Sequence, residues 1–196
     1  MTPLRIGALG AGGFGLFALQ QFLQTPNAQL LAMAGTHREA ALAMMRRFGV
    51  SDVVEESALL ANPEVDLVYI ATPPFLHYRQ ARAALLAGKH VICEKPLALT
   101  VAEADELVVL ARQNGRLCIA NLMQRYNPLF ESVRQLIASR ALGEFLHGSF
   151  ENFASDEGLS LEHWFWDREK SGGIFIEHGV HFFDLFSGWL GEGTVV

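Results

Sequence analysis

Three side chains in this sequence combine residue types and spacing that suit proton transfer and charge stabilisation. Lys95 stands two residues after the apolar segment 90–93, and Glu177 and His181 stand four residues apart. An ammonium at the end of a buried strand can donate a hydrogen bond to a reacting oxygen and stabilise an alkoxide. A carboxylate four residues from an imidazole lies on the same helix face, raises the basicity of the ring and fixes its tautomer. We therefore predict that Lys95 polarises the reacting oxygen, His181 moves the proton and Glu177 orients His181.

The same C-terminal cluster has a metal site as its alternative interpretation. Imidazole and carboxylate groups suit zinc or iron, and the cluster contains Glu177, His178, His181 and Asp184. On a helix, however, adjacent residues such as Glu177 and His178 point to different faces. No cysteine or further acidic cluster completes the ligand set, so we predict no metal site.

A glycine-rich segment at residues 10–15 fits the pattern G-x-G-x-x-G. It follows a predicted strand at 4–9 and opens a predicted helix at 13–24, which is the context that a dinucleotide site requires. The glycines allow a tight turn, close approach of a pyrophosphate and close packing of helix on strand. The helix N-terminus then favours the phosphate charge. The segment predicts cofactor contacts from Gly10, Gly12, Gly13, Phe14 and Gly15.

The end of the second predicted strand, 29–35, bears on the choice of dinucleotide. NAD sites usually place a carboxylate there, on the ribose hydroxyls. This sequence instead has Thr36, His37 and Arg38. Since Thr36 and Arg38 can bind a 2′-phosphate that a carboxylate would repel, we predict contacts from these three residues and a lean toward NADP over NAD. The alternative is that Arg38 is a solvated residue in the first turn of a helix.

Short apolar segments alternate with helical patterns through residues 1–122. Thr100 and Glu103 have the spacing of a capping box at the start of one such helix. This alternation predicts an α/β domain, a Rossmann-type doubly wound parallel sheet with right-handed crossovers. The predicted strands are 4–9, 29–35, 52–54, 65–71, 90–93 and 117–121, and the predicted helices are 13–24, 38–48, 76–86, 100–114 and 128–140.

Composition excludes several classes of protein. The chain has 196 residues, of which 51% are hydrophobic, so it is not disordered. Its formal net charge of −6 argues against nucleic-acid binding. The longest stretch without Asp, Glu, Lys or Arg, residues 6–37, is broken by glycines and polar residues and is not a membrane span. We expect a soluble, cytoplasmic protein with no membrane partner.

Three further segments, with the glycine-rich turn, resemble one family in order and spacing. They are Ile70-Ala-Thr-Pro-Pro-Phe-Leu-His77, Glu94-Lys-Pro96 and Gly172-Gly-Ile-Phe-Ile-Glu-His-Gly-Val-His-Phe-Phe-Asp184. The chain is similar to the glucose–fructose oxidoreductase / inositol dehydrogenase / MocA (Gfo/Idh/MocA) family. The resemblance implies an NAD(P)-dependent oxidoreductase that transfers hydride between the nicotinamide and a sugar, polyol or inositol-like secondary alcohol. The alternative is a dinucleotide-binding sensor or an inactive fragment on the same scaffold.

The resemblance also implies roles for individual residues. It makes Lys95 a contact of both nicotinamide and substrate, and Glu94 its cofactor-side neighbour. It makes His77 a cofactor contact, where the alternative is a helix-start histidine held by backbone. It makes Arg125 a cofactor or substrate contact, where the alternative is a surface residue at a helix start. The loop that faces the nicotinamide ribose is Thr72, Pro73 and Pro74.

The sequence departs from this family in two respects. The family usually has Asp where this chain has Glu177. Its members are much longer, and their second domain is an α+β substrate domain with an open antiparallel sheet. We expect only the start of that domain at 123–196, with a strand at 144–153 and a helix at 179–190. Exposed strand edges and aromatic faces then predict a homo-oligomer or a fragment of a longer protein.

Overall fold

The computed structural model describes residues 3–10, 12–35, 42, 52–153 and 158–194. The chain divides into two compact units, Met1–Asn121 and Leu122–Val196, a division one residue before the predicted domain boundary. Most of the predicted helix 38–48 lies outside the described residues.

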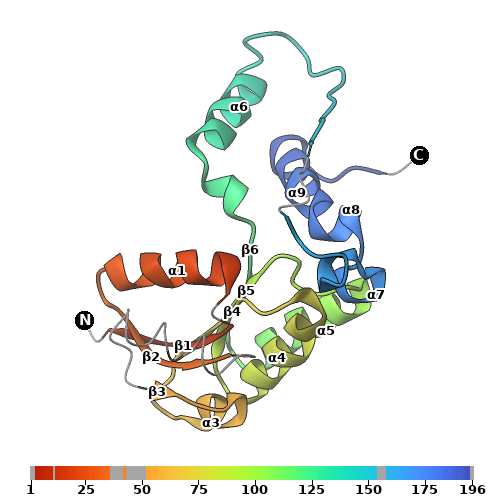
Figure 1. The fold of residues 1–196 in the computed structure, drawn as a ribbon. Helices are drawn as coiled ribbons and strands as arrows, with labels where there is room; N and C mark the ends of the chain where they lie inside the picture. The colour runs from red at the N-terminus through yellow and green to blue at the C-terminus, as the bar shows by residue number, and fades with distance from the viewer. Residues whose placement is uncertain (1–2, 11, 36–41, 43–51, 154–157, 195–196) are drawn as a thin grey trace. The chain divides into compact units, whose positions relative to one another are not determined.

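The first unit is built on a six-stranded sheet in which every pair of neighbouring strands is parallel (Figure 1). The strand order β3-β2-β1-β4-β5-β6 is that of a doubly wound dinucleotide-binding fold, so the predicted fold class is confirmed. The order reverses between β1 and β4, which is where such sheets bind ligands. The strands are β1 (Leu4–Leu9), β2 (Ala28–Ala34), β3 (Asp52–Val53), β4 (Leu67–Ile70), β5 (His90–Glu94) and β6 (Cys118–Asn121).

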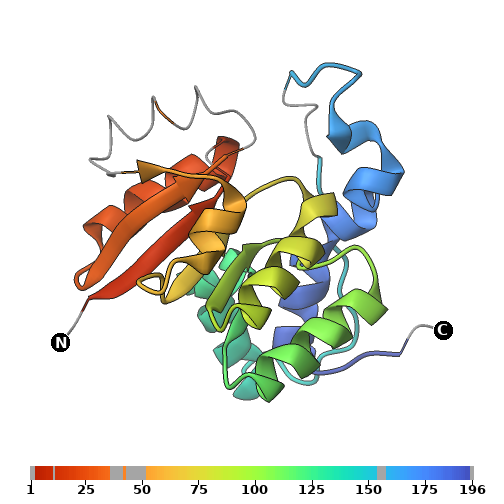
Figure 2. The ribbon, with the colours of Figure 1, turned by 90° about the horizontal axis from the view of Figure 1, so that it is seen from below.

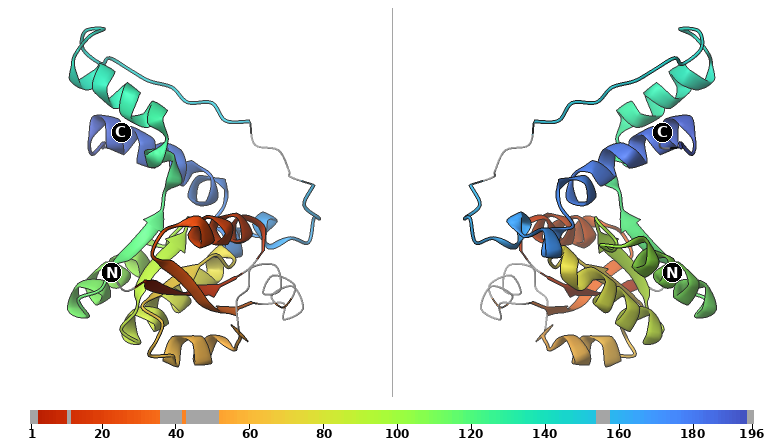
Figure 3. Two further views of the ribbon diagram at one scale, coloured as in Figure 1. Left: turned by 90° about the vertical axis from the view of Figure 1, so that its left-hand side faces the viewer. Right: turned by 90° about the vertical axis from the view of Figure 1, so that its right-hand side faces the viewer.

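Helices cover both faces of this sheet. Helix α1 lies on one face, and Figure 3 shows it opposite α3. Figure 2, seen from below, shows α3, α4 and α5 on the face turned toward the viewer. The predicted capping box is present, since the Thr100 hydroxyl accepts from the Glu103 N–H and the Glu103 carboxylate accepts from the Thr100 N–H. The helices are α1 (Gly13–Gln24), α3 (Glu56–Ala61), α4 (Pro74–Leu86) and α5 (Val101–Gln113).

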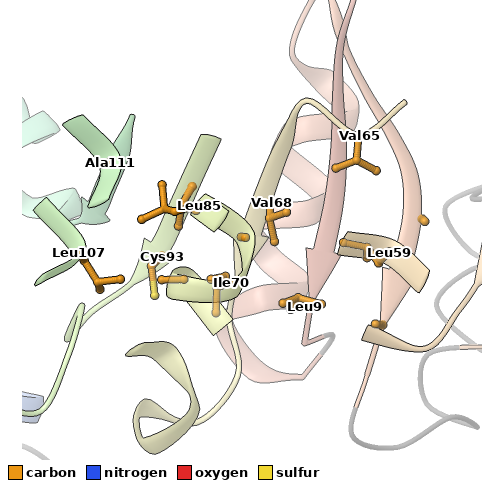
Figure 4. Packing of buried hydrophobic residues seen from close by; sticks show 14 residues of the cluster. Leu9, Leu59, Val65, Val68, Ile70, Leu85, Cys93, Leu107 and Ala111 are labelled. Carbon is orange, nitrogen blue, oxygen red and sulfur yellow. The ribbon is translucent and has the colours of Figure 1, made fainter. Parts of the chain in front are cut away.

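The core of the first unit lies in two apolar layers, one on each face. The larger layer packs α3, α4 and α5 against the sheet through residues such as Leu59, Ile70, Leu85 and Leu107 (Figure 4). The smaller layer packs Leu19 of α1 and other apolar residues on the opposite face. Strands buried on both faces explain the nearly continuous apolar runs in the sequence.

The second unit contains no strand among its described residues. The predicted strand at 144–153 is wrong: this segment has no regular secondary structure. A strand needs a hydrogen-bonded neighbour, and no other described segment of this unit offers an extended edge. None of the described helices has the length and apolar content to cross a membrane. The elements of this unit are η1 (Met123–Tyr126), α6 (Pro128–Ala138), η2 (Trp164–Trp166), α7 (Arg168–Ser171), α8 (Ile174–Glu177) and α9 (Gly179–Leu190).

An ion pair joins the amino ends of β1 and β4. The Arg5 guanidinium donates two hydrogen bonds of 2.9 Å to the Asp66 carboxylate, which also accepts from the Arg5 backbone N–H at 3.0 Å. These donors lower the pKa of Asp66 to about 2. Since protonation removes the acceptor, the pair contributes to stability only while Asp66 is ionised.

We predict that Asp66→Asn lowers the free energy of unfolding by about 1 kcal/mol at neutral pH, because both partners are about one-third exposed and water screens the pair. The folded-state pKa of Asp66 is below its unfolded value. Its contribution is therefore present above the unfolded pKa of about 3.8 and is lost as the pH falls toward 2. Urea melts between pH 2 and 7 measure the difference, which should vanish at the acid end.

Glu64→Gln is the matched control. The Glu64 carboxylate lies 3.9 Å from the same guanidinium and is 71% exposed, so its removal should leave the melts unchanged. A constant difference between Asp66→Asn and the wild type from pH 7 to pH 2 would contradict the assignment.

Candidate functional site

The glycine-rich turn approaches the end of β4 as closely as backbone allows. Gly10 has φ +91°, and a Cβ on it would stand 2.6 Å from the carbonyl oxygen of Ala71. A Cβ on Gly15 would stand 2.8 Å from the Ala71 Cβ. Around Gly12, by contrast, a Cβ would meet nothing within 4 Å, and α1 begins directly after it. The turn therefore leaves the N-terminus of α1 accessible to a pyrophosphate, and these residues fit a dinucleotide.

Two sets of predicted cofactor residues remain: Phe14 in the turn, and the three residues 36–38 that follow β2. Phe14 is 41% exposed and its ring lies 5.4 Å from that of Phe17. Thr36, His37 and Arg38, predicted to select the cofactor, lie outside the described residues.

A pocket opens at the carboxyl ends of β1, β2 and β4, lined among others by Leu9, Gly35 and Thr72. A chain of polar groups forms one wall. The Thr72 hydroxyl donates to Gln80 Oε1 at 2.5 Å, and Gln80 Nε2 donates to Glu56 Oε2 at 2.8 Å. This pocket places the predicted loop residue Thr72 beside the end of β2, at the point where the strand order reverses.

Arg79 completes that wall. Its guanidinium donates to both oxygens of Glu56, at 2.7 and 3.0 Å. Burial alone would raise the pKa of Glu56, but the hydrogen bonds from Arg79 and Gln80 outweigh it and hold that pKa below its ordinary value. Glu56 therefore remains ionised and keeps Arg79 and Gln80 oriented.

The carboxylate that precedes Lys95 is held by its two neighbouring strands. Tyr69 of β4 donates to Glu94 Oε1 at 2.5 Å, and Asn121 at the end of β6 donates to the same oxygen at 2.8 Å. Tyr69 is fully buried, and burial, with the hydrogen bond to Glu94, raises the pKa of its phenol far above the ordinary value. Tyr69 therefore stays a donor, and the end of β5 that carries Lys95 is tied to β4 and β6.

His77 is also buried at this edge, with 1% of its surface exposed. Its Nε2 lies 2.6 Å from the carbonyl oxygen of Thr72, and its Nδ1 lies 2.7 Å from that of Pro96. Burial lowers the pKa of His77, while the two carbonyl oxygens oppose that shift. These contacts favour a histidine held by backbone. The peptide bond between Lys95 and Pro96 is cis.

In the second unit, Arg125 lies in η1 and pairs with Asp184 of α9. The guanidinium donates to the two carboxylate oxygens at 2.7 and 2.8 Å and to the Asp184 carbonyl at 3.2 Å. The sequence left open whether Arg125 contacts a ligand, and that role stays a prediction. The described contacts show that it holds η1 on α9.

The predicted pair Glu177 and His181 does not share one helix. Helix α8 ends at Glu177 and α9 begins at Gly179, and the His181 N–H donates to the His178 carbonyl, three residues back. The prediction that Glu177 and His178 face apart is wrong, since the Glu177 carboxylate contacts His178 Nδ1. The reason is that they stand at a junction between helices, where helical periodicity does not apply.

The structure thus places the predicted residues in two groups. The first unit brings Gly10, Gly15, Thr72, His77 and Glu94 to one edge of its sheet, with Lys95 at the end of β5. The second unit holds Glu177, His181 and Arg125. Sequence reasoning missed the polar partners Tyr69, Gln80 and Glu56. A tyrosine within a buried apolar strand was the available signal, because a buried phenol needs a hydrogen-bond partner.

Comparison with known proteins identifies the family of this fold. A family model described as an oxidoreductase family with an NAD-binding Rossmann fold matches residues 4–122. A second model, the Gfo/Idh/MocA C-terminal domain, matches residues 130–196. Among solved structures, biliverdin reductase from Synechocystis, in complex with biliverdin and NADP+, superposes with a TM-score of 0.82 at 28% identity and covers 99% of this chain and 60% of that one.

Two curated relatives extend over nearly the whole chain. One is dTDP-3,4-didehydro-2,6-dideoxy-alpha-D-glucose 3-reductase from Streptomyces violaceoruber, 33% identical, matching 98% of this chain and 56% of its own length. The other is scyllo-inositol 2-dehydrogenase (NAD(+)) from Bacillus subtilis, 26% identical, at 96% and 54%. The chain spans about half the length of these relatives. With both family models matching in order, the chain belongs to the Gfo/Idh/MocA oxidoreductase family.

Proposed function

We propose that this chain carries the cofactor domain and part of the substrate domain of an NAD(P)-dependent oxidoreductase that acts on a sugar, polyol or inositol-like secondary alcohol or the corresponding ketone. The observation that carries the proposal is the arrangement around Lys95. Strand β5, which precedes Lys95, ends at the same edge of the sheet as the glycine-rich turn. Hydrogen bonds hold both residues that flank Lys95, namely Glu94 and Pro96. The named sugar reductase and inositol dehydrogenase among the relatives support the substrate class.

Different residues of the chain have separate roles in the proposed reaction. The nicotinamide supplies or accepts the hydride when the cofactor is bound. The N-terminus of α1 would hold the pyrophosphate through its N–H groups, and the Thr72–Pro74 loop would contact the nicotinamide ribose. Lys95 donates a hydrogen bond to the reacting oxygen and stabilises the negative charge that develops there. His181 takes or returns the proton, and Glu177 orients it through the α8–α9 junction.

We predict that Lys95→Met lowers kcat by about a hundred- to a thousand-fold, the usual effect of removing one charge-stabilising donor from a transition state. His181→Asn should lower kcat by about a hundred- to ten-thousand-fold, because it removes the general acid–base. Both should keep cofactor binding, measured by quenching of tryptophan fluorescence. Turnover is followed at the nicotinamide absorbance with a panel of polyols and ketosugars.

Lys170→Met is the matched control for the lysine. Lys170 is exposed and pairs with Asp167 at 3.0 Å on α7, so its removal should leave kcat unchanged. His147→Asn is the control for the histidine, since His147 is exposed in a segment without regular structure. If the wild type binds the cofactor but converts no substrate, the proposed enzyme activity is contradicted and the alternative, a dinucleotide-binding sensor, is supported.

We propose NADP as the preferred cofactor. No carboxylate follows β2 at Gly35–Arg38, and the pocket's Glu56 is already paired with Arg79 and Gln80. We predict that Arg38→Ala raises the KM for NADP by about ten- to a hundred-fold, as expected for the loss of a hydrogen bond to a charged group, and leaves the KM for NAD unchanged. Arg112→Ala in the last turn of α5 is the control. A lower KM for NAD than for NADP in the wild type would overturn this preference.

We also propose that the chain associates in solution. Large apolar side chains of the second unit are exposed, and Leu146 and Phe153 are 90% and 92% exposed. Exposed apolar surface favours association. Light scattering over a range of concentrations should show a species larger than the 21.6 kDa monomer, and a monodisperse monomer would contradict the proposal.

A further inference from the structure

His77 is buried beside Lys95 although its ring touches no reacting group in the described contacts. It stands in the first turn of α4, and both of its ring nitrogens face backbone carbonyl oxygens. A buried imidazole of this kind is expensive unless its nitrogens find partners. The two partners belong to different loops, so the ring joins segments that the sheet itself does not connect.

One loop is the segment between β4 and α4, where the Thr72 carbonyl lies 2.6 Å from Nε2. This loop lines the pocket, and its Thr72 hydroxyl is already fixed by Gln80. The other loop follows β5, where the Pro96 carbonyl lies 2.7 Å from Nδ1. Proline has no N–H, so its carbonyl is the one backbone hydrogen-bonding group through which Pro96 can be held.

We propose that His77 is a positioning residue that sets the backbone of Lys95 relative to the Thr72 loop: its neutral ring donates the Nδ1–H to the Pro96 carbonyl and packs with Nε2 against the Thr72 carbonyl. The inference rests on the proposed function and deepens it. The Lys95 ammonium stands at the end of a flexible four-carbon chain, so its placement depends on how firmly its backbone is held. Tyr69 and Asn121 hold Glu94, the residue before Lys95, and His77 holds Pro96, the residue after it.

The chemistry of the ring explains why this position holds a histidine. Imidazole has two nitrogens on separate sides of one rigid ring, whereas an amide side chain carries both polar atoms at one end. Asparagine reaches about as far as Nδ1 and glutamine about as far as Nε2. His77→Asn therefore places a donor near Pro96 and no polar atom near Thr72, and His77→Gln does the reverse.

The two variants should separate the two contacts. We predict that His77→Gln lowers kcat by about ten- to a hundred-fold, because a displacement of the order of 1 Å at a reacting group has effects of this size. Its dissociation constant for NADPH should stay close to that of the wild type. His77→Asn should keep most of kcat and raise that dissociation constant by roughly fivefold, because the shorter side chain no longer reaches the Thr72 carbonyl and that loop is held less firmly.

A histidine on β5, the strand that precedes Lys95, offers the control. His90 begins β5, at the opposite edge of the sheet from Lys95, and its Nδ1 accepts from the Leu117 N–H at 3.1 Å. The Asn and Gln variants of His90 should change thermal stability at most, with kcat and cofactor affinity unchanged. If both His77 variants behave in this way, the residue is merely structural and the proposal is overturned.

A second measurement keeps the test independent of turnover. In ¹⁵N-labelled protein, the Lys95 amide signal should shift in His77→Gln and stay in place in His77→Asn, whether or not any substrate is converted. A Lys95 signal that is unchanged in His77→Gln contradicts the positioning role. A wild type that binds NADPH and converts no substrate contradicts the proposed function instead, so the two failures are distinguishable. If His77→Gln does not fold, the wild-type spectrum decides. A slowly exchanging Nδ1–H of His77 supports the contact with Pro96, and a rapidly exchanging ring N–H overturns it.

Discussion

The close approach of the glycine-rich turn to Ala71 is the constraint on which the cofactor side of this molecule depends. A side chain at Gly10 would collide with the Ala71 carbonyl, and one at Gly15 would collide with the Ala71 methyl group. Contact at this distance sets the separation between the N-terminus of α1 and the loop that begins at Thr72. The first of these is the proposed site of the pyrophosphate, at the middle of the dinucleotide, and the second is the proposed site of the nicotinamide ribose. A larger residue in the turn would therefore disturb both contacts at once.

The same edge of the sheet also contains buried polar groups, whose presence needs a separate explanation. Burying the Glu94 carboxylate and the Tyr69 phenol costs free energy that their hydrogen bonds largely offset, so such groups add little net stability over apolar residues. The rest of β4 and β5 shows that apolar residues fit these strands well. We infer that the polar groups are present for orientation. They define where the strand ends and in which direction Lys95 leaves it, as His77 does from the other side.

The local rules that govern the first unit are strong enough to be read from sequence, and those of the second unit are not. The strand 4–9 and the helix 13–24 were predicted to the residue, because buried parallel strands and helices beginning in glycine-rich turns have distinct patterns. Helix α3 was missed because six residues are too short for a periodicity to show. The segment 144–153 alternates like a strand, but pairing depends on a partner that the pattern cannot supply. Glu177 shows the same limit, since a four-residue spacing indicates a shared face only if the helix is continuous.

The proposed chemistry draws on both units, and the two contributions differ in kind. The glycine-rich turn, the Thr72 loop and Lys95 all lie within Met1–Asn121, where buried contacts hold the residues on either side of Lys95. The proposed proton carrier His181 lies in the second unit, on a helix that Arg125 and Asp184 tie to η1. Changes at His181 should therefore act on turnover while leaving cofactor affinity intact. Changes at Ala71 or the glycine-rich turn should abolish both turnover and cofactor binding, because the reaction needs a cofactor bound in the correct position relative to Lys95.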